Sequence, residues 1–435
     1  MLSSRLPKDL TPSPFFAELE RAKAQVLAEC ADARGNAGCL PFIDMTVSSP
    51  LRVGLPFDLQ PAVEKAKGEF GTWVADAAGR RDAREAVAEY YRERGGNFTA
   101  GQIILTASTS EAYSVLFKAF CDPGDVILTP MPGYPLLDTL AQLEHLECAP
   151  YFLKLRRQSV KAKRNVILSE AKNPVTSSFR FVLDSDSLLA APERAKILLL
   201  VSPHNPTGHC VSREEWNEAV RFCEENDMIL VVDEVFADYA FSDKVQRSWK
   251  YVLGSSRPED IWDAGNGDFI NLPEDGPKCP IFWLNGLSKA VGSPQLKLGW
   301  MAFYAPREKF EEIRAALEFV EDAYLSVSAP AQALARPMLE ASAAYESSIR
   351  ERLLQNWNTL RETFPGKYCP EVLGGWYAVV RLGEDDEEIT LRLLCEKHVL
   401  VQPGFFFDFD EDGWVVISLL QEPTQFKQAI ERIKE

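Results

Sequence analysis

Between about residues 100 and 305, short apolar runs alternate with longer stretches in which apolar residues recur at helical spacing. The apolar runs are rich in isoleucine, leucine and valine, as is typical of strands buried on both faces of a sheet. They are Ile103–Leu105, Val126–Leu128, Ile197–Val201, Met228–Val232 and Ile281–Leu284. Helices are predicted between them, for example over Glu111–Phe120 and Arg213–Glu225. The alternation predicts an α/β fold with a mostly parallel central sheet covered by helices.

The pattern changes after about residue 305. Apolar residues recur at spacings of three and four, which predicts amphipathic helices over 310–320, 345–364 and 426–433. Strands are predicted over Tyr377–Leu382, Val399–Gln402 and Trp414–Leu420. We therefore expect a large domain over residues 61–310 and a smaller α+β domain over 311–435, with residues 1–60 forming an N-terminal arm and part of the small domain.

Two stretches resemble insertions. Residues 156–180 are basic, polar and weakly periodic, and residues 243–280 are rich in glycine, proline and charge. Both are predicted to form surface loops. A basic loop can bind an anion, but the composition favours a solvated, variable excursion without a role in function.

The charge balance restricts the partners. Asp and Glu outnumber Lys and Arg by 64 to 47, a net charge of −17. So acidic a chain repels nucleic acid and anionic membranes, and we expect neither as a partner. The longest apolar runs, such as Ile197–Val201, are far too short to span a bilayer. The four histidines lack the spacing of metal ligands, so no metal site is expected.

The nine cysteines are scattered along the chain and form no CxxC motif. An odd, scattered set is typical of reduced thiols rather than of a disulfide framework, which favours a cytoplasmic location.

The segment Thr106–Glu111 follows a predicted strand and opens a predicted helix. Ser108 and Glu111 have the spacing of a capping box, with Ser108 as the N-cap. Thr109 and Ser110 then lie in the first turn, where free amides, hydroxyls and the positive end of the helix dipole suit a phosphate group. An ordinary N-cap explains the same residues.

Asn205, in the turn His204-Asn205-Pro206-Thr207-Gly208, follows the buried strand Ile197–Val201. Open α/β sheets bind ligands beyond the carboxyl ends of their strands, although Asn-Pro and Thr-Gly pairs also make structural turns. Asp233 ends the next buried strand and needs a cation or several donors. It is either an N-cap for the following segment or a carboxylate that faces a protonated ring nitrogen.

Lys289 lies in Gly286-Leu287-Ser288-Lys289, directly after the predicted strand Ile281–Leu284. Most lysines are surface charges. A lysine at the end of a buried strand, among glycine and serine, is a candidate for a desolvated amine that forms a Schiff base.

Taken together, these residues resemble the class I/II aminotransferases, which are fold type I, aspartate-aminotransferase-like enzymes dependent on pyridoxal 5′-phosphate (PLP). The resemblance covers nearly the whole chain and rests on the order of the motifs. The phosphate turn is followed by the Pro-Gly-Tyr-Pro sequence around Tyr134, the Asn205 turn, the Asp233-Glu234 pair and the Ser288-Lys289 pair.

The resemblance implies a role for each matching position. Lys289 would hold PLP as an imine and move a proton during catalysis, and Asp233 would keep the pyridine nitrogen protonated. Asn205 would donate to the phenolic oxygen, and Tyr134 would stack on the ring. Thr109, Ser110 and Lys297 would bind the phosphate. Residues 61–310 would then be the PLP-binding domain.

The chain also departs from the family pattern. Lys297 stands where the family usually has arginine, Gly286 where it often has serine, and Phe236 where it usually has tyrosine. Trp73 takes the place of a tyrosine that reaches the phosphate of the partner subunit. The resemblance therefore implies a homodimer with shared active sites.

The largest departure is near the C-terminus. The family usually has an arginine that binds the substrate α-carboxylate at the position where this chain has Val416. Two other cations are candidates for that role: Arg52, in the segment that the family folds over its site, and Arg381, on a predicted strand.

The resemblance implies a transaminase of amino acid metabolism, which moves an amino group from an amino acid or related amine to a 2-oxo acid. A lyase, decarboxylase or cyclising enzyme on the same cofactor is the alternative, because one fold hosts many reactions. A PLP-sensing regulator would need a DNA-binding domain, for which the segment before residue 100 is too short and too acidic.

Overall fold

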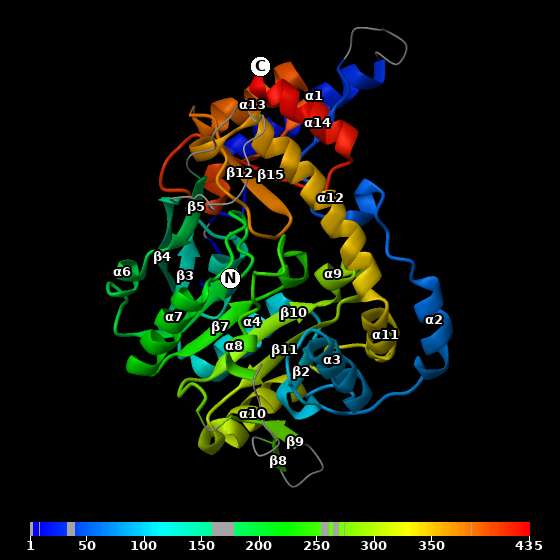
Figure 1. Cartoon of the computed structure of the whole chain (residues 1–435), viewed down its shortest axis with the longest axis vertical. Coiled ribbons are helices and arrows are strands. Elements are labelled where there is room, and N and C mark those ends of the chain that lie inside the picture. Colours follow the sequence, from blue (N-terminus) through cyan, green and yellow to red (C-terminus); the bar gives the residue numbers. More distant parts are fainter. Residues whose placement is uncertain are drawn as a thin grey trace, which may run out of the picture.

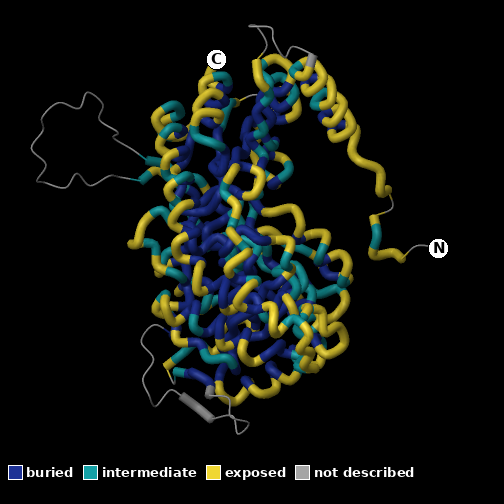
Figure 2. The backbone as a smooth tube through the Cα atoms, turned by 90° about the vertical axis from the view of Figure 1, so that its right-hand side faces the viewer, coloured by how far each residue is buried: buried dark blue, intermediate teal, exposed yellow. Residues whose placement is uncertain are grey.

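The computed structural model of the chain describes residues 3–7, 9–32, 40–158, 178–253, 261–263, 269–273, 275–383 and 385–435. Figure 1 shows a large part built around one sheet and a smaller part above it, with the long helix α12 (Ser342–Thr363) running between the two. In Figure 2 the buried backbone fills the interior of both parts, and the N-terminal segment extends along the outside.

The central sheet has eight strands in the order β2-β11-β10-β7-β6-β3-β4-β5. Their bounds are β2 Ile103–Thr106, β3 Val126–Met131, β4 Glu147–Gln158, β5 Ser178–Leu183, β6 Ala195–Val201, β7 Ile229–Asp233, β10 Ile281–Gly286 and β11 Gly299–Tyr304. Neighbours from β10 to β4 are parallel, whereas β11 and β5 pair antiparallel with their neighbours. The predicted α/β fold with a mostly parallel sheet is confirmed, and each predicted buried run lies in a strand.

Helices cover this sheet. They are α2 Gln60–Ala66, α3 Arg81–Glu93, α4 Thr109–Phe120, α5 Leu136–Leu143, α6 Ser185–Leu188, α7 Arg213–Glu225, α8 Lys250–Leu253, α9 Leu287–Ala290, α10 Arg307–Asp322 and α11 Ala329–Glu340. Helix α7 has the predicted bounds because Ser212 and Glu215 form a reciprocal capping box at its start.

The smaller part combines the N-terminal arm with the C-terminal elements. They are α1 Pro14–Asp32, β1 Ile43–Asp44, β12 Tyr377–Arg381, α13 Asp386–Lys397, β13 Val399–Leu400, β14 Gln402–Pro403, β15 Trp414–Ser418 and α14 Pro423–Lys434. Strands β12, β15 and β14 form an antiparallel sheet, and β1 of the arm pairs in parallel with β13. The single strand predicted over Val399–Gln402 is therefore two short strands in different sheets.

Helices α10 and α11 pack with the large part, although α10 crosses the expected domain boundary at residue 310 and α11 follows it. Helix α10 contacts α4, and α11 contacts α2 and α3. We therefore propose a boundary near the start of α12 in place of residue 310.

The expectation of two surface loops was wrong in part. The ends of the first insertion are paired strand residues, since β4 continues to Gln158 and β5 begins at Ser178. Within the second insertion, Trp249 is fully buried against the ring of Tyr91, and the guanidinium of Arg247 is largely buried against Asp238. The second stretch also contains the short paired strands β8 Ile261–Asp263 and β9 Phe269–Asn271. Residues 159–177, 254–260, 264–268 and 274 of the two predicted loops lie outside the described residues.

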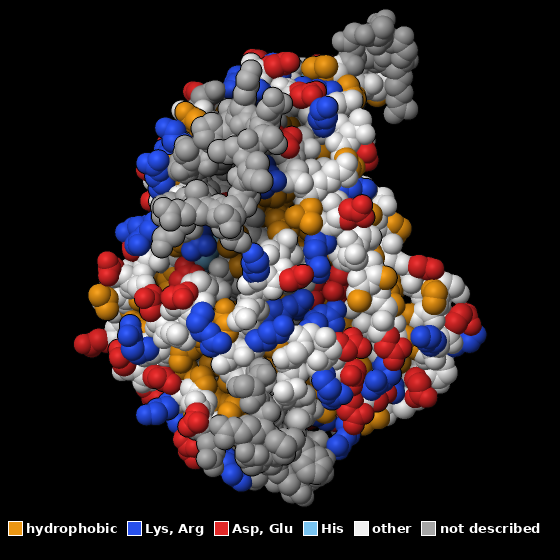
Figure 3. All heavy atoms as spheres, viewed as in Figure 1, with side chains coloured by type: hydrophobic (Ala, Val, Ile, Leu, Met, Phe, Trp, Pro, Cys, Tyr) orange, Lys and Arg blue, Asp and Glu red, His pale blue; other side chains and the backbone are white. Residues whose placement is uncertain are grey.

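Charged side chains of both signs lie on the surface (Figure 3). Acidic and basic side chains lie interspersed over the face shown in Figure 3. Among the described helices, none combines the length and apolarity that a membrane span requires.

A buried ionic network joins α12 to the large part. Asp238, which is fully buried, accepts hydrogen bonds from Tyr90 at 2.7 Å and Arg94 at 3.1 Å and pairs with Arg247 at 2.8 Å. Arg94 also donates to Glu346 of α12 at 2.6 Å. Burial raises the pKa of Asp238, but Arg247 and Arg94 outweigh it, so that this pKa lies below its ordinary value.

We expect Asp238→Asn to lower the free energy of unfolding by about 3–5 kcal/mol, because the buried guanidinium of Arg247 loses its counter-charge. Urea denaturation of cofactor-free protein measures this. The carboxyl of Asp238 has a lower pKa in the folded than in the unfolded state, so its charge stabilises the fold at pH values above the ordinary pKa of about 3.9. This stabilisation is lost as the pH falls through the folded-state pKa. The difference between wild type and variant should therefore shrink in acid.

The matched control is Glu340→Gln, whose half-exposed carboxylate pairs only loosely with Lys65 at 3.6 Å. It should change stability by less than about 1 kcal/mol. Equal effects of the two substitutions would contradict a structural role for the network.

Candidate active site

A pocket of about 330 Å³ opens where the central parallel strands end. Val201, Asp233 and Gly286, the last residues of β6, β7 and β10, line it. The turn at Ser108 closes one side. Ligands of open α/β sheets bind at this edge because the carboxyl ends of neighbouring parallel strands meet there.

Most of the residues singled out in the sequence line this one pocket. They are Thr109, Ser110, Tyr134, Asn205, Asp233, Phe236, Lys289 and Lys297. The sequence separates them by up to 188 positions, from Thr109 to Lys297 (297 − 109), and the strand order brings them together.

The N-terminus of α4 forms one end of the pocket. Ser108 is its N-cap, with Oγ accepting from the amide of Glu111 at 3.2 Å. The carboxylate of Glu111 accepts from the amide of Ala107 rather than from that of Ser108, so only half of the expected capping box forms. The amides of Thr109 and Ser110 lie in the first turn, where N–H groups have no partner within the helix. They suit an anion.

Two features bring further groups to this end. A Cβ on Gly299 would lie 3.0 Å from the carbonyl carbon of Ser108, so any other residue there would push β11 and the turn apart by a few tenths of an ångström. Lys297, just before β11, lines the pocket in the left-handed conformation, with φ of 52°. The backbone of β11 therefore brings an ammonium group to the same end as the amides of α4.

Asp233 lies deep in the pocket and has two donors. Tyr113 donates to Oδ2 at 2.7 Å, and the amide of Val235 donates to Oδ1 at 3.0 Å. Burial raises the pKa of Asp233 above its ordinary value, while Tyr113, Val235 and the charge of Lys289 lower it. A carboxylate accepts about four hydrogen bonds, so this one retains the capacity for a cationic N–H.

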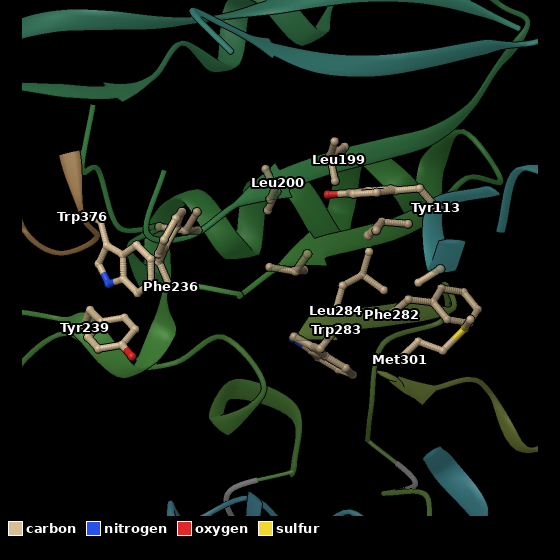
Figure 4. Packing of buried hydrophobic residues seen from close by; sticks show 14 of the residues in the cluster. Tyr113, Leu199, Leu200, Phe236, Tyr239, Phe282, Trp283, Leu284, Met301 and Trp376 are labelled. Carbon is tan, nitrogen blue, oxygen red and sulfur yellow. The ribbon is translucent and has the colours of Figure 1, made fainter. Parts of the chain in front are cut away.

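Sequence reasoning missed Tyr113. Its position four residues after Thr109 was an available signal, because residues at that spacing lie on the same helix face. Figure 4 shows the tyrosine ring reaching across the strand ends.

Lys289 follows β10 in an aromatic enclosure. Its Nζ lies 4.6 Å from the ring centroid of Trp376 and 5.4 Å from that of Phe236. Burial lowers the pKa of Lys289 to about 8, against the opposing effect of Asp233. Tyr239 donates to the carbonyl of Lys289 at 2.6 Å, which fixes the backbone there. Figure 4 shows the rings of Phe236, Tyr239 and Trp376 grouped together.

Asn205 contributes an amide with unused hydrogen-bonding capacity. It lines the pocket, and its buried Oδ1 has no partner within the described part of the chain. A buried, unsatisfied acceptor typically costs about 1–3 kcal/mol, so this oxygen indicates a ligand in the pocket, and the Nδ2 of the same amide can donate to an oxygen of that ligand.

Three of the expected site residues lie elsewhere. Trp73 is 72% exposed and borders a separate surface depression with Glu321 and Leu325. Arg52 is exposed on the short helix Pro50–Val53, and Arg381 pairs with Glu411 and lies over the ring of Trp414 at 5.6 Å. The structure does not bring either arginine into the pocket.

The polar groups of the pocket fit one kind of ligand. A pyridine N–H matches Asp233, a phenolic oxygen matches Asn205, an aldehyde matches the partly desolvated amine of Lys289, and a phosphate matches the turn at Thr109. This set on a mostly parallel α/β sheet defines a fold type I PLP enzyme.

Comparison with known proteins gives the family. The model of "Aminotransferase class I and II" matches residues 62–433. Alanine aminotransferase of Mycobacterium tuberculosis is 25% identical over 390 residues, 86% of this chain and 79% of that protein. Tyrosine aminotransferase of Caenorhabditis elegans is 22% identical over 367 residues, 82% and 69% of the two chains.

Solved structures share the fold. A crystal structure of an aminotransferase from Escherichia coli superposes with a TM-score of 0.74 at 19% identity, over 100% of this chain and 97% of that one. The chain belongs to the class I and II aminotransferases and is a PLP-dependent transaminase.

We expect cofactor-free protein to react with PLP through Lys289 at a rate that rises with pH and levels off above about 8, because only the neutral amine attacks an aldehyde. Stopped-flow absorbance between pH 6.5 and 9.5 measures the rate, and borohydride reduction with peptide mapping identifies the lysine. Lys289→Ala should abolish the reducible link, and Lys297→Ala should retain it. A rate still rising steeply between pH 9 and 9.5, or label on Lys297, would contradict the assignment.

Proposed function

We propose that the pocket residues divide the work of transamination as their positions suggest. The observation that supports this is the convergence of Lys289, Asp233 and Asn205 at the carboxyl ends of β10, β7 and β6. When bound, PLP supplies a ring that withdraws electrons from the substrate α-carbon. The remaining steps depend on the side chains of this chain.

Lys289 holds the cofactor and moves the proton between the substrate α-carbon and the cofactor. A pKa lowered to about 8 suits it to both accept and release a proton near neutral pH. Trp376 and Phe236 surround its Nζ and limit the access of water.

Asp233 keeps the ring nitrogen protonated, and Tyr113 orients the carboxylate for that purpose. Asn205 donates a hydrogen bond from its amide nitrogen to the phenolic oxygen. Phe236 has no hydroxyl and therefore makes no hydrogen bond to that oxygen. Tyr134 covers the ring, and Thr109, Ser110 and Lys297 hold the phosphate.

The amino donor is an amino acid or related amine, and the acceptor is a 2-oxo acid. The names of the relatives, alanine and tyrosine aminotransferases, support this class of substrate for the chain. Since eight described cysteines are free thiols, we also propose a reducing, cytoplasmic location.

We expect a suitable amino donor to convert the bound cofactor to its amine form in a single turnover, with loss of the absorbance of the lysine-linked form. Asp233→Asn should slow this step by about 10²–10³-fold, because a buried charge facing the ring nitrogen is lost. The exposed Asp227, with a 98% exposed side chain, supplies the control Asp227→Asn, which should react at the wild-type rate. Release of ammonia or carbon dioxide instead of the amine form would favour the lyase or decarboxylase alternative.

We propose that the chain works as a homodimer in which Trp73 reaches the phosphate of the partner subunit. The indole of Trp73 is 72% exposed, and the exposed Val74 and Leu325 lie beside it. Because large apolar side chains that cluster on a surface often mark an interface, these three residues support this part of the surface as the dimer contact.

Sedimentation of the PLP-loaded protein should therefore give the mass of a dimer at micromolar concentration. Trp73→Ala should weaken retention of PLP, whereas Tyr368→Ala, at an exposed aromatic residue outside this surface, should not. A fully active monomer would overturn the proposal.

A further inference from the structure

A buried carboxyl group that takes no part in the active site lies at the end of α10. Glu321 is 2% exposed, and its Oε1 is buried without a hydrogen-bond partner among the residues that the structure describes. The residue lines the surface depression that Trp73 and Leu325 border, which we propose as part of the dimer contact. Native structures rarely leave a buried acceptor unpaired, so this oxygen indicates that a further group completes the site.

The surroundings of Glu321 are acidic. Ser326, which lines the same depression, donates to the carboxylate of Glu111 at 2.7 Å and so places a negative charge beside it. Asp76 is the other charged residue of the described lining, and it pairs with Arg84 at 3.2 Å. A depression whose described charged residues are all acidic attracts a cation rather than an anion.

These surroundings keep the carboxyl of Glu321 mostly protonated in a single chain at neutral pH. Burial, and then the charge of Glu111, raise its pKa to about 8. On α10 itself, Glu318 lies one turn earlier and is paired with Arg314 at 2.8 Å. A cation brought to Oε1 would lower the pKa of Glu321, and the proton would leave to solvent.

The size of the depression limits what can fill it. Its volume is about 20 Å³, enough for one water-sized group such as the ammonium of a lysine or one nitrogen of a guanidinium. The exposed side chains of Trp73, Val74 and Leu325 line it as well. A second copy of the chain would cover these apolar groups, and they would exclude water from a charge pair between them.

We propose that Glu321 is a cation-binding site at the dimer contact, filled by a lysine or arginine side chain of a second copy of this chain. The carboxyl releases its proton to solvent when the cation arrives, and the two-fold symmetry of a homodimer forms the pair twice. The inference rests on the proposed homodimer and specifies a contact that stabilises it.

The pairing makes the dimer sensitive to pH. Glu321 has a pKa of about 8 in the separate chain and a lower pKa in the dimer, so the dimer binds fewer protons than its separate subunits. The stabilisation by the pair is therefore fully present above about pH 8 and is lost as the pH falls through the lower pKa of the dimer.

The test measures the exchange of subunits between PLP-loaded dimers that carry a donor or an acceptor fluorophore at the N-terminus. Reduction with borohydride beforehand keeps the cofactor attached at every pH. The exchange rate of the wild type should rise at least about tenfold from pH 8.5 to pH 6, because one charge-assisted hydrogen bond is worth that factor or more. Differences in dimer affinity appear mainly in the dissociation rate, which subunit exchange reports.

Two neutral variants remove the titrating group. Glu321→Gln and Glu321→Met should exchange at a rate that does not depend on pH in this range and that exceeds the wild-type rate at pH 8.5 by about tenfold or more. Glu311→Gln makes the same change at an exposed position of α10 and should retain the rate and the pH dependence of the wild type. Neutral variants at Glu321 that keep the pH dependence would overturn the inference.

The inference and the homodimer proposal fail in different ways. Wild-type exchange that is independent of pH would mean that water or a neutral group satisfies Glu321. Exchange that quickens with rising pH would mean that the carboxyl stays protonated in the dimer. Either result overturns the inference and leaves the homodimer intact. If the PLP-loaded protein sediments as a monomer at every pH, the homodimer proposal is wrong, and the inference is wrong with it.

Discussion

The parallel pairing of β7 with β10 is the interaction on which the active site depends. The register places Asp233 opposite Leu284, so that the chain leaving β10 carries Lys289 to the neighbourhood of the carboxylate. Burial favours the neutral form of each group, since it raises the pKa of Asp233 and lowers that of Lys289, and the two charges oppose those shifts in each other. An amine that is partly neutral near physiological pH beside a buried carboxylate is the result.

The rest of the large domain holds this pair in place. Tyr113 reaches Asp233 from α4, and Tyr239 fixes the backbone of Lys289. Close approach of β10 and β11 contributes as well, because a Cβ on Gly286 would lie 2.9 Å from the Cα of Gly299. A serine at that position, which the family often has, would need the two strands to move apart.

The small domain completes the pocket from a different direction. Tyr377 and Ser48 are far apart in the sequence and both line the pocket because β1 pairs with β13 and the amide of Ser418 donates to the carbonyl of Met45 at 2.7 Å. The same packing fills the position of Val416 with sheet core. The charged residues of the described lining, Asp233, Lys289 and Lys297, therefore come from the large domain, whereas the small domain and the arm add the hydroxyls of Tyr377 and Ser48.

The sequence by itself determined the fold class and predicted most of the residues that line the pocket. Buried strands have a strong compositional signal, and motifs such as the turn at Asn205 or the pair Ser288-Lys289 lie within a few residues of a strand end, where local chemistry reveals them. Only the tertiary structure decided which residues far from the motifs in the sequence come to lie at the site. Tyr113, Trp376 and Ser48 acquire their roles only through helix and sheet packing, and Arg247, predicted in a loop, is buried because Asp238 supplies a counter-charge. It also decided that Arg52 and Arg381 stay outside the pocket, since a cation's direction depends on partners such as Glu411, which the local sequence does not specify.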